Sequence, residues 1–203
     1  MNKITIFDTE YLSVEGSMRR FWSGPNDPDP TVVQIGAVKV DLDRNCAIEG
    51  TARILIQPKA RNGLNCSIGD YLSELTGITD DEINRSGVSL SQALFEFDEF
   101  SEGSDLWSWG KDELILIAIS CFINGIESPI SARRFGNCKK LLMSAGMTED
   151  DIANTNSGQL QKHFGLGGES QREHDALDDA ISIARTLRRL MEDEKLSKND
   201  FCV

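Results

Sequence analysis

A short acidic motif at the end of the first apolar run, Asp8-Thr9-Glu10, constrains this chain more than any other part of its sequence. Residues 3–8 have the pattern of a β-strand. Side chains alternate along a strand, so Asp8 and Glu10 leave the same face. Two carboxylates on one face repel each other and are costly to bury. A hard cation such as Mg²⁺ or Mn²⁺, which prefers carboxylate oxygens, would resolve that conflict. The alternative is a solvated strand end with two acids, which the short motif alone favours.

A second candidate element, His174 and Asp179, lies at the start of the last predicted helix. Five residues within one helix correspond to a rotation of about 140°, so the two side chains cannot converge if both are helical. They can converge if His174 lies in the preceding loop and Asp179 faces inward from the second turn. If Asp175 is the N-cap, the helix begins directly after it and His174 lies in the preceding loop. The alternative is a surface histidine before an acidic helix, with Asp178 solvated.

A third acidic position is Asp112, which follows Trp109-Gly110 at the start of an apolar helix predicted over 112–122. It is a candidate metal ligand. Its ordinary interpretation is a first-turn acid that the helix dipole favours. Glu113 is a weaker candidate for the same role.

The remaining pattern predicts an α/β fold. We expect strands at 3–8, 31–41, 51–57 and 106–109, and helices at 67–75, 79–84, 89–100, 112–122, 139–145, 158–164 and from about 176 to 191. Strands first and then alternating helices and strands indicate a mixed sheet covered by helices. The 203 residues fit one domain over 1–203, with a long loop at 11–30, a further loop at 165–173 and a flexible tail at 195–203.

Composition excludes some classes of protein. The net charge of −12 argues against binding long duplexes by charge alone, although bound ions would reverse the field of clustered carboxylates. Five cysteines without a Cys-x-x-Cys pair argue against a zinc or disulfide framework and indicate reduced thiols in a cytoplasm. No run approaches the roughly 18 apolar residues of a membrane span. The first residues lack a signal-peptide pattern, so we expect a cytoplasmic protein without membrane association.

Five segments occur in an order that resembles the DEDDh exonucleases of the RNase H-like superfamily, which include RNase T and the proofreading subunit of bacterial DNA polymerase III. The matching segments are Phe7 to Glu10, Val33 to Val38, Leu75 to Ile78, Trp107 to Asp112 and His174 to Asp179. Two departures stand out. The segment from Tyr11 to Pro30 is longer than the corresponding link in compact members, and the region around Asp112 is the least standard match.

This resemblance implies an RNase H-like mixed sheet of about five strands flanked by helices, and hydrolysis from the 3′ end that releases nucleoside 5′-monophosphates. It implies two Mg²⁺ or Mn²⁺ ions as cofactors. Asp8, Glu10 and Asp179 would hold one ion, Asp8 would bridge to the second, and Asp112 would act through water. His174 would take the proton from the attacking water.

The resemblance also implies contacts to the terminal nucleotide. The backbone of Thr9 is a candidate for the 3′ hydroxyl, and Leu75 and Ile78 are candidates for a wedge against the last base. Candidates for stacking on bases, a contact of roughly 1–3 kcal/mol each, are Tyr11, Phe21 and Trp22. The alternative for these rings is a loop anchored to the core. Candidate phosphate contacts, otherwise a solvated face, are Arg19, Arg20, Arg133, Arg134, Lys139 and Lys140.

Three functions stay open at this point. The first is an exonuclease on single-stranded RNA or DNA. The second is a hydrolase of short oligonucleotides or other small phosphodiesters, and the third is a non-catalytic nucleic-acid-binding module that retains the fold. Four carboxylates with one histidine argue against the third. We expect a monomer or a homodimer, because the apolar segment 114–122 fits a core, which we favour, or an interface.

Overall fold

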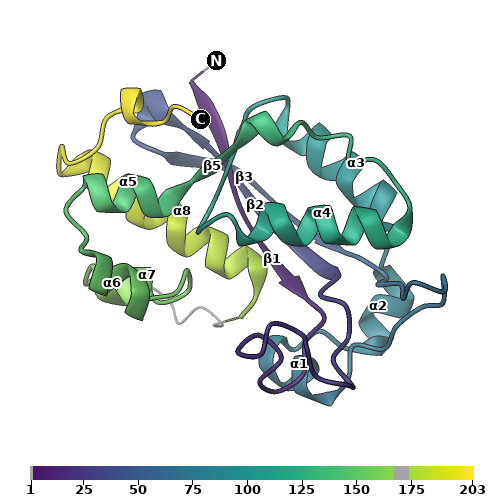
Figure 1. Ribbon diagram of the computed structural model, residues 1–203. Helices are drawn as coiled ribbons and strands as arrows, with labels where there is room; N and C mark the ends of the chain where they lie inside the picture. Colours follow the sequence, from purple (N-terminus) through teal and green to yellow (C-terminus); the bar gives the residue numbers. More distant parts are fainter. Residues whose placement is uncertain (1, 167–173) are drawn as a thin grey trace.

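A five-stranded mixed sheet forms the centre of the protein, as the computed structural model shows for residues 2–166 and 174–203 (Figure 1). The strands lie in the order β3-β2-β1-β4-β5. Their bounds are β1 Lys3–Tyr11, β2 Val32–Asp41, β3 Ala47–Leu55, β4 Asp105–Ser108 and β5 Phe135–Asn137. The first three strands are antiparallel neighbours, whereas β4 runs parallel to β1 and β5 parallel to β4. The mixed sheet predicted from the order of elements is confirmed.

Helices cover both faces of this sheet (Figure 1). Their bounds are α1 Asp70–Thr76, α2 Asp80–Ser86, α3 Leu90–Ser101, α4 Asp112–Asn124, α5 Cys138–Ser144, α6 Glu149–Asn154, α7 Leu160–His163 and α8 Ala176–Glu192. Ile4 and Ile6 of β1 pack with α5 and α8 on one face, and Phe7 packs with α3 and α4 on the other. A third apolar cluster joins α1 and α2 to the sheet around Leu72 and Ile83. None of the helices among the described residues has the length and apolarity needed to cross a bilayer.

Two elements were not predicted, β5 and α6. β5 has only three residues, too few for a period of two to be recognised. α6 is polar, and a capping box between Thr148 and Asp151 rather than an apolar stripe defines its start. The loop predicted at 165–173 lies mostly outside the described residues, since the structure describes none of 167–173.

The C-terminal segment differs from the flexible tail predicted at 195–203. Leu196 and Phe201 are buried in the same cluster as α8. The Phe201 ring lies edge-on to Trp107 with ring centroids 5.5 Å apart. Lys198 pairs with Asp43 at 2.9 Å. Apolar side chains therefore hold the segment against the sheet, a contact that its polar sequence does not reveal.

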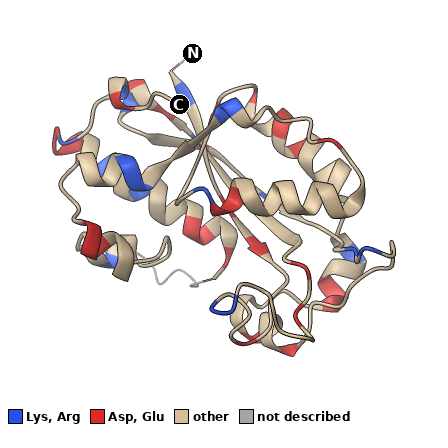
Figure 2. Ribbon diagram, in the orientation of Figure 1, with Lys and Arg blue, Asp and Glu red and all other residues tan. Residues whose placement is uncertain are grey.

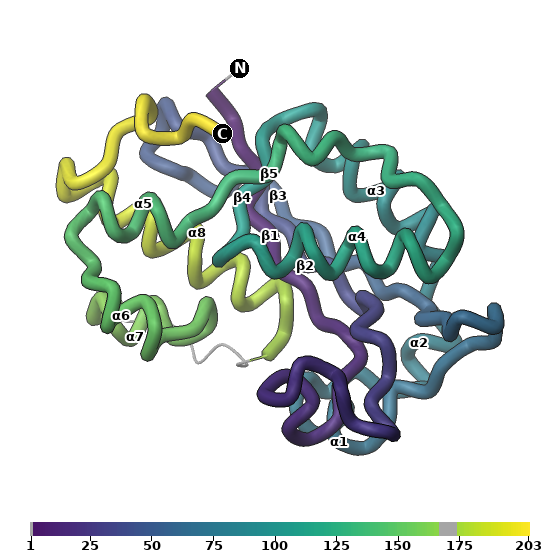
Figure 3. The backbone as a smooth tube through the Cα atoms, in the orientation of Figure 1, coloured from purple at the N-terminus to yellow at the C-terminus, as the bar shows by residue number. Residues whose placement is uncertain are grey.

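The long loop between β1 and β2 is a series of turns beside α1 at one end of the sheet (Figure 3). The N–H of Leu12 donates to the carbonyl of Thr31, which closes the loop at its base. The Arg20 guanidinium donates to both oxygens of Asp27 and to the carbonyl of Glu15. Arg20, a candidate phosphate contact, is thus engaged within the loop, where it lowers the pKa of Asp27.

Candidate active site

Three carboxylates from two elements meet at the end of the sheet. Asp8 and Glu10 come from β1 and Asp179 comes from α8, and one potential ligand atom of each lies within 4.8 Å of the others. Asp8 is 7% exposed, Glu10 8% and Asp179 6%. Figure 2 shows the acidic starts of α4 and α8 converging on the acidic end of β1. The structure therefore brings together the two acids of the first motif and the acid predicted on the last helix.

Gly36 of β2 allows α8 to come this close. It is the cross-strand partner of Asp8. A Cβ at Gly36 would lie 2.1 Å from the backbone nitrogen of Leu177 and 2.2 Å from the carbonyl carbon of Ala176. Any side chain would therefore displace the first turn of α8, which carries Asp179. Gly36 lies in one of the five segments that resemble the DEDDh exonucleases, but that resemblance gave no reason for a glycine at this position.

Gln34 fixes the same turn through hydrogen bonds. Its Oε1 accepts from the N–H of Ala176 at 3.0 Å, and its Nε2 donates to Asp175 Oδ2 at 3.2 Å. Asp175 in turn accepts from the N–H groups of Leu177 and Asp178, so the predicted N-cap is confirmed. One amide from β2 therefore links the sheet to the start of α8.

Burial governs the electrostatics of the cluster. Burial, followed by the charges of Asp179 and Asp175, raises the pKa of Glu10 from 4.5 to about 9. Burial raises the pKa of Asp8 well above its usual value, and the charges of Glu113, Asp179 and Glu10 raise it further. Crowded carboxylates in a dry site favour protonation or a bound cation. An all-oxygen set of this kind fits a hard divalent cation.

A small turn just before α7 also supports Asp179. The hydroxyl of Ser157 donates to Asp179 Oδ2 at 3.2 Å. A Cβ at Gly158 would lie 2.5 Å from Asp179 Oδ1, so the backbone of Gly158 packs directly on the carboxylate. Neither residue was predicted as part of the site. Nothing in the local sequence indicates that this turn folds back onto α8.

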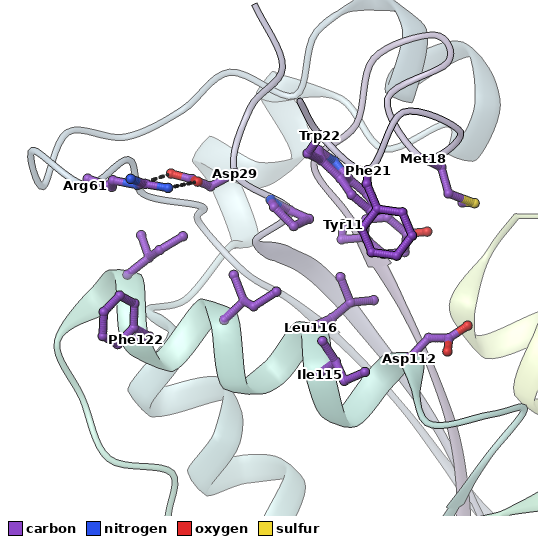
Figure 4. Close-up of a pocket in the computed structure, with 13 residues that line it drawn as sticks. Tyr11, Met18, Phe21, Trp22, Asp29, Arg61, Asp112, Ile115, Leu116 and Phe122 are labelled. Atoms are coloured by element: carbon purple, nitrogen blue, oxygen red, sulfur yellow. Dashed lines mark hydrogen bonds and ion pairs between the residues drawn. The ribbon is translucent and has the colours of Figure 1, made fainter. Parts of the chain in front are cut away.

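The start of α4 presents Glu113 rather than Asp112 to the cluster. Glu113 is buried, and its carboxyl shares a hydrogen bond with Asp8. Its Oε2 has no hydrogen-bond partner among the residues that the structure describes. Asp112 is exposed and lies at the edge of an adjoining groove (Figure 4). A ligand role for Asp112 stays a prediction, and Glu113 is the better placed carboxylate.

The rotation of α4 decides between these two acids. Adjacent residues of a helix differ by about 100° in direction. Glu113 shares the buried face of Leu116 and Ile117, whereas Asp112 shares the opposite side with Ile115. Because α4 is apolar on both sides, periodicity could not identify its core face from the sequence.

His174 precedes the Asp175 cap and lies outside the helix, as predicted. It is partly buried, and its φ of +66° is in the left-handed region, which a single histidine tolerates. The carboxylate group described above does not include it. Its role as a base stays a prediction.

The residues predicted to contact substrate are distributed over the same end of the sheet. The Thr9 side chain is buried, and its hydroxyl has no hydrogen-bond partner among residues 2–166 and 174–203. Leu75 is partly buried, and Ile78 is fully buried in the cluster around α1 and α2, so their contact with a base stays a prediction. Tyr11 and Trp22 lie together, with ring centroids 5.8 Å apart.

Two of the basic candidates differ in their surroundings. Arg134 is bound to Asp98 and to the carbonyl of Ser104, which occupies its guanidinium within the protein. The Lys139 ammonium lies 5.0 Å from the centroid of the Trp109 ring, at the start of α4. Lys139 is therefore the better placed cation for a phosphate near the acids.

No protein-family model and no curated protein sequence matches this chain. Solved structures do match. The nuclease domain of 3′hExo, described as a DEDDh family member bound to rAMP, has a TM-score of 0.76 and 22% identity, over 95% of this chain and 92% of that chain. A full-length 3′-exonuclease matches equally well, with 61% of its length spanned. E. coli exonuclease I, in complex with single-stranded DNA, matches with a TM-score of 0.63 and 14% identity. The match covers 98% of this chain but 42% of that chain.

These matches establish the class of fold. The chain has the RNase H-like fold of the DEDDh 3′-exonucleases. The resemblance identified in the sequence is thus confirmed at the level of the fold.

Proposed function

We propose that this protein is a metal-dependent 3′-5′ exonuclease that hydrolyses single-stranded nucleic acid and releases nucleoside 5′-monophosphates. The observation that carries the proposal is the buried group of Asp8, Glu10 and Asp179 at the end of β1. The bound ligands of two structural neighbours, rAMP in 3′hExo and single-stranded DNA in exonuclease I, support this substrate class.

The acids hold the cofactor in this proposal. Asp8, Glu10 and Asp179 would bind Mg²⁺ or Mn²⁺, and Glu113 would complete the set beside Asp8. Two such ions would offset the charge that builds up on the phosphate oxygens during hydrolysis. Without a cation, burial and mutual repulsion raise the pKa of Asp8 and of Glu10, so these acids bind a cation in competition with protons.

His174 accepts the proton of the water that attacks the phosphorus, since histidine changes its protonation near neutral pH. The backbone of Thr9, between the two acids of β1, positions the 3′ hydroxyl of the terminal nucleotide. The leaving group is the 3′ oxygen of the preceding nucleotide. The shortened strand therefore ends in a new 3′ hydroxyl and can enter the next cycle.

A substrate panel tests the proposal. Single- and double-stranded RNA and DNA are incubated with Mg²⁺ or Mn²⁺, and the products are analysed by mass spectrometry. We expect nucleoside 5′-monophosphates from single strands, removed in order from the 3′ end. A 3′-phosphate block should stop the reaction. Degradation of a 3′-blocked strand from its free 5′ end, or products with a 3′-phosphate, would contradict the proposed polarity and chemistry.

Paired substitutions at the start of α4 test which acid completes the site. Glu113→Gln should lower the rate of nucleotide release by about a hundredfold, because it removes a buried charge next to Asp8. Asp112→Asn should stay within about threefold of the wild type, since exposed charges contribute little. Both variants are measured on the same single strand at saturating Mg²⁺. The opposite order of effects would restore Asp112 as the ligand.

A further inference from the structure

An apolar groove of about 620 Å³ runs beside the acids along α4 (Figure 4). Its two walls contain Tyr11, Phe21 and Trp22 on one side and Ile115, Ile119 and Phe122 on the other. We call this feature the apolar groove. Phe21 is 88% exposed and Phe122 is 87% exposed. Exposed apolar surface of this kind marks a binding site more often than a structural need. The outer face of α4, predicted to be core, is therefore open.

The groove starts at the acidic cluster. Tyr11, which lines the groove, directly follows Glu10 on β1. Asp112 also lines the groove, one residue before Glu113. A long ligand with a phosphodiester at the acids would therefore have its next groups in the groove.

The loop wall of the groove holds an uncommon backbone conformation. Phe21 and Trp22 are consecutive residues with φ of +55° and +50°. Bulky side chains rarely adopt these angles, and such strain clusters at binding sites. The hydrogen bond from Trp22 N–H to the Ser17 carbonyl, 2.9 Å, and the ion pair of Arg20 with Asp27 hold the turn. The loop thus presents two adjacent aromatic rings at some conformational cost.

Two basic residues lie at the far end of the groove, and one of them, Arg61, is paired with Asp29. Lys59 and Arg61 line an adjoining cavity of about 530 Å³ together with Phe122. Arg61 also lines the groove itself and pairs with Asp29 at 2.6 Å. Apolar walls match the bases of a nucleic-acid strand, and Lys59 is the better placed cation for a phosphate at that end. Because the net charge is −12, attraction to phosphates contributes little to the affinity for a nucleic-acid strand. Stacking on the bases is then the main source of that affinity.

We infer that the apolar groove binds unpaired bases of the substrate strand on the 5′ side of the cleaved phosphodiester, an inference that rests on the proposed function. At 1.5 Å per residue, the helix from Ile115 to Phe122 extends about 10 Å, which accommodates about three stacked bases at 3.4 Å spacing. Bases inside a duplex are stacked on their neighbours and paired, so they are not available to the groove. The groove therefore selects single strands.

Equilibrium binding tests the inference without catalysis. The affinity of a fluorescently labelled hexanucleotide is measured in EDTA for the wild type, Ile115→Ser and Phe122→Ser. Both side chains are exposed, so these variants should fold. Each should raise Kd about tenfold, the loss expected for one stacking contact. Phe95→Ser, on the exposed side of α3, is the matched control and should bind like the wild type.

An abasic hexanucleotide identifies the bases as the occupant. Removing the three bases upstream of the terminal pair should weaken wild-type binding at least tenfold, and Phe122→Ser should add little to that loss. Equal wild-type affinity for the normal and the abasic strand would overturn the inference. So would unchanged hexanucleotide binding by Phe122→Ser together with a shift from dimer to monomer in sedimentation, because the groove would then be a protein interface.

Cleavage separates this inference from the proposed function. With Mn²⁺, Phe122→Ser, at the end of the groove away from the acids, should cleave a dinucleotide at the wild-type rate but a hexanucleotide about tenfold more slowly at subsaturating concentration. If the wild type cleaves neither oligonucleotide but the variants bind the hexanucleotide more weakly as expected, the exonuclease proposal fails and the groove assignment stands. If the variants bind and cleave the hexanucleotide like the wild type, the groove assignment fails and the exonuclease proposal stands.

Discussion

Asp8→Asn and Asp179→Asn should each lower the rate of nucleotide release by about a thousandfold or more, because each removes a charge from the proposed cation site. The two carboxylates come from different elements and meet only in the folded protein. The rate is measured on a 3′-labelled single strand with Mg²⁺ and with Mn²⁺. Asp105→Asn, a partly buried acid on neighbouring β4, is the control and should retain the wild-type rate.

Stability distinguishes a lost function from a lost fold in these variants. Burial raises the pKa of Glu10 from its usual 4.5 to about 9 in the folded protein, and the pKa of Asp8 is also raised. Between these values the folded protein holds protons that the unfolded chain has released, so the metal-free protein loses stability as the pH rises from about 5 to 9. The slope is up to about 1.4 kcal/mol per pH unit for each proton.

Asp8→Asn removes one of these carboxyls, whose pKa burial and the charges of Glu113, Asp179 and Glu10 raise. In EDTA the variant should therefore unfold at a higher urea concentration than the wild type at pH 8, and the difference should shrink toward pH 5. Added Mg²⁺ should stabilise the wild type but hardly affect the variant. A variant that is less stable than the wild type at pH 8 would contradict the desolvated cluster, and a full rate for either acid variant would contradict the metal assignment.

Gly36→Ala should abolish the proposed activity without touching a charged group. The added methyl would lie 2.1 Å from the nitrogen of Leu177, so the first turn of α8 must move and carry Asp179 with it. A displacement of about 1 Å at a catalytic group can lower the rate by about a hundredfold. Overpacking at a tight contact also destabilises by typically 1–3 kcal/mol. We expect both losses, measured as the rate on a single strand and as the urea midpoint.

Gly50→Ala on neighbouring β3 is the matched control. A Cβ there approaches only the ring of Phe100, at 3.8 Å, which is ordinary van der Waals contact. This variant should keep the wild-type rate and should be at least as stable as the wild type, because alanine restricts the unfolded chain. If Gly36→Ala behaved like Gly50→Ala, the position of α8 would not depend on this glycine.

The local pattern of the sequence determined the elements that carry the acids. The alternation of β1 placed Asp8 and Glu10 on one face, and the Asp175 cap placed the start of α8 so that His174 lies before it. Both inferences depend on interactions within a few residues, which a sequence displays directly. The order of five segments indicated the RNase H-like fold, which the structural comparisons confirm.

The tertiary structure alone decided which side chains complete the cluster. Gly36 sets how closely α8 approaches the sheet, Ser157 and Gly158 hold Asp179, and the rotation of α4 turns Glu113 inward and Asp112 outward. Each of these contacts joins elements far apart in the chain. A helix that is apolar on two sides has no periodicity to reveal which side faces the core. Packing therefore determined that Glu113 lies next to the three acids, and it determined which face of α4 lines the apolar groove.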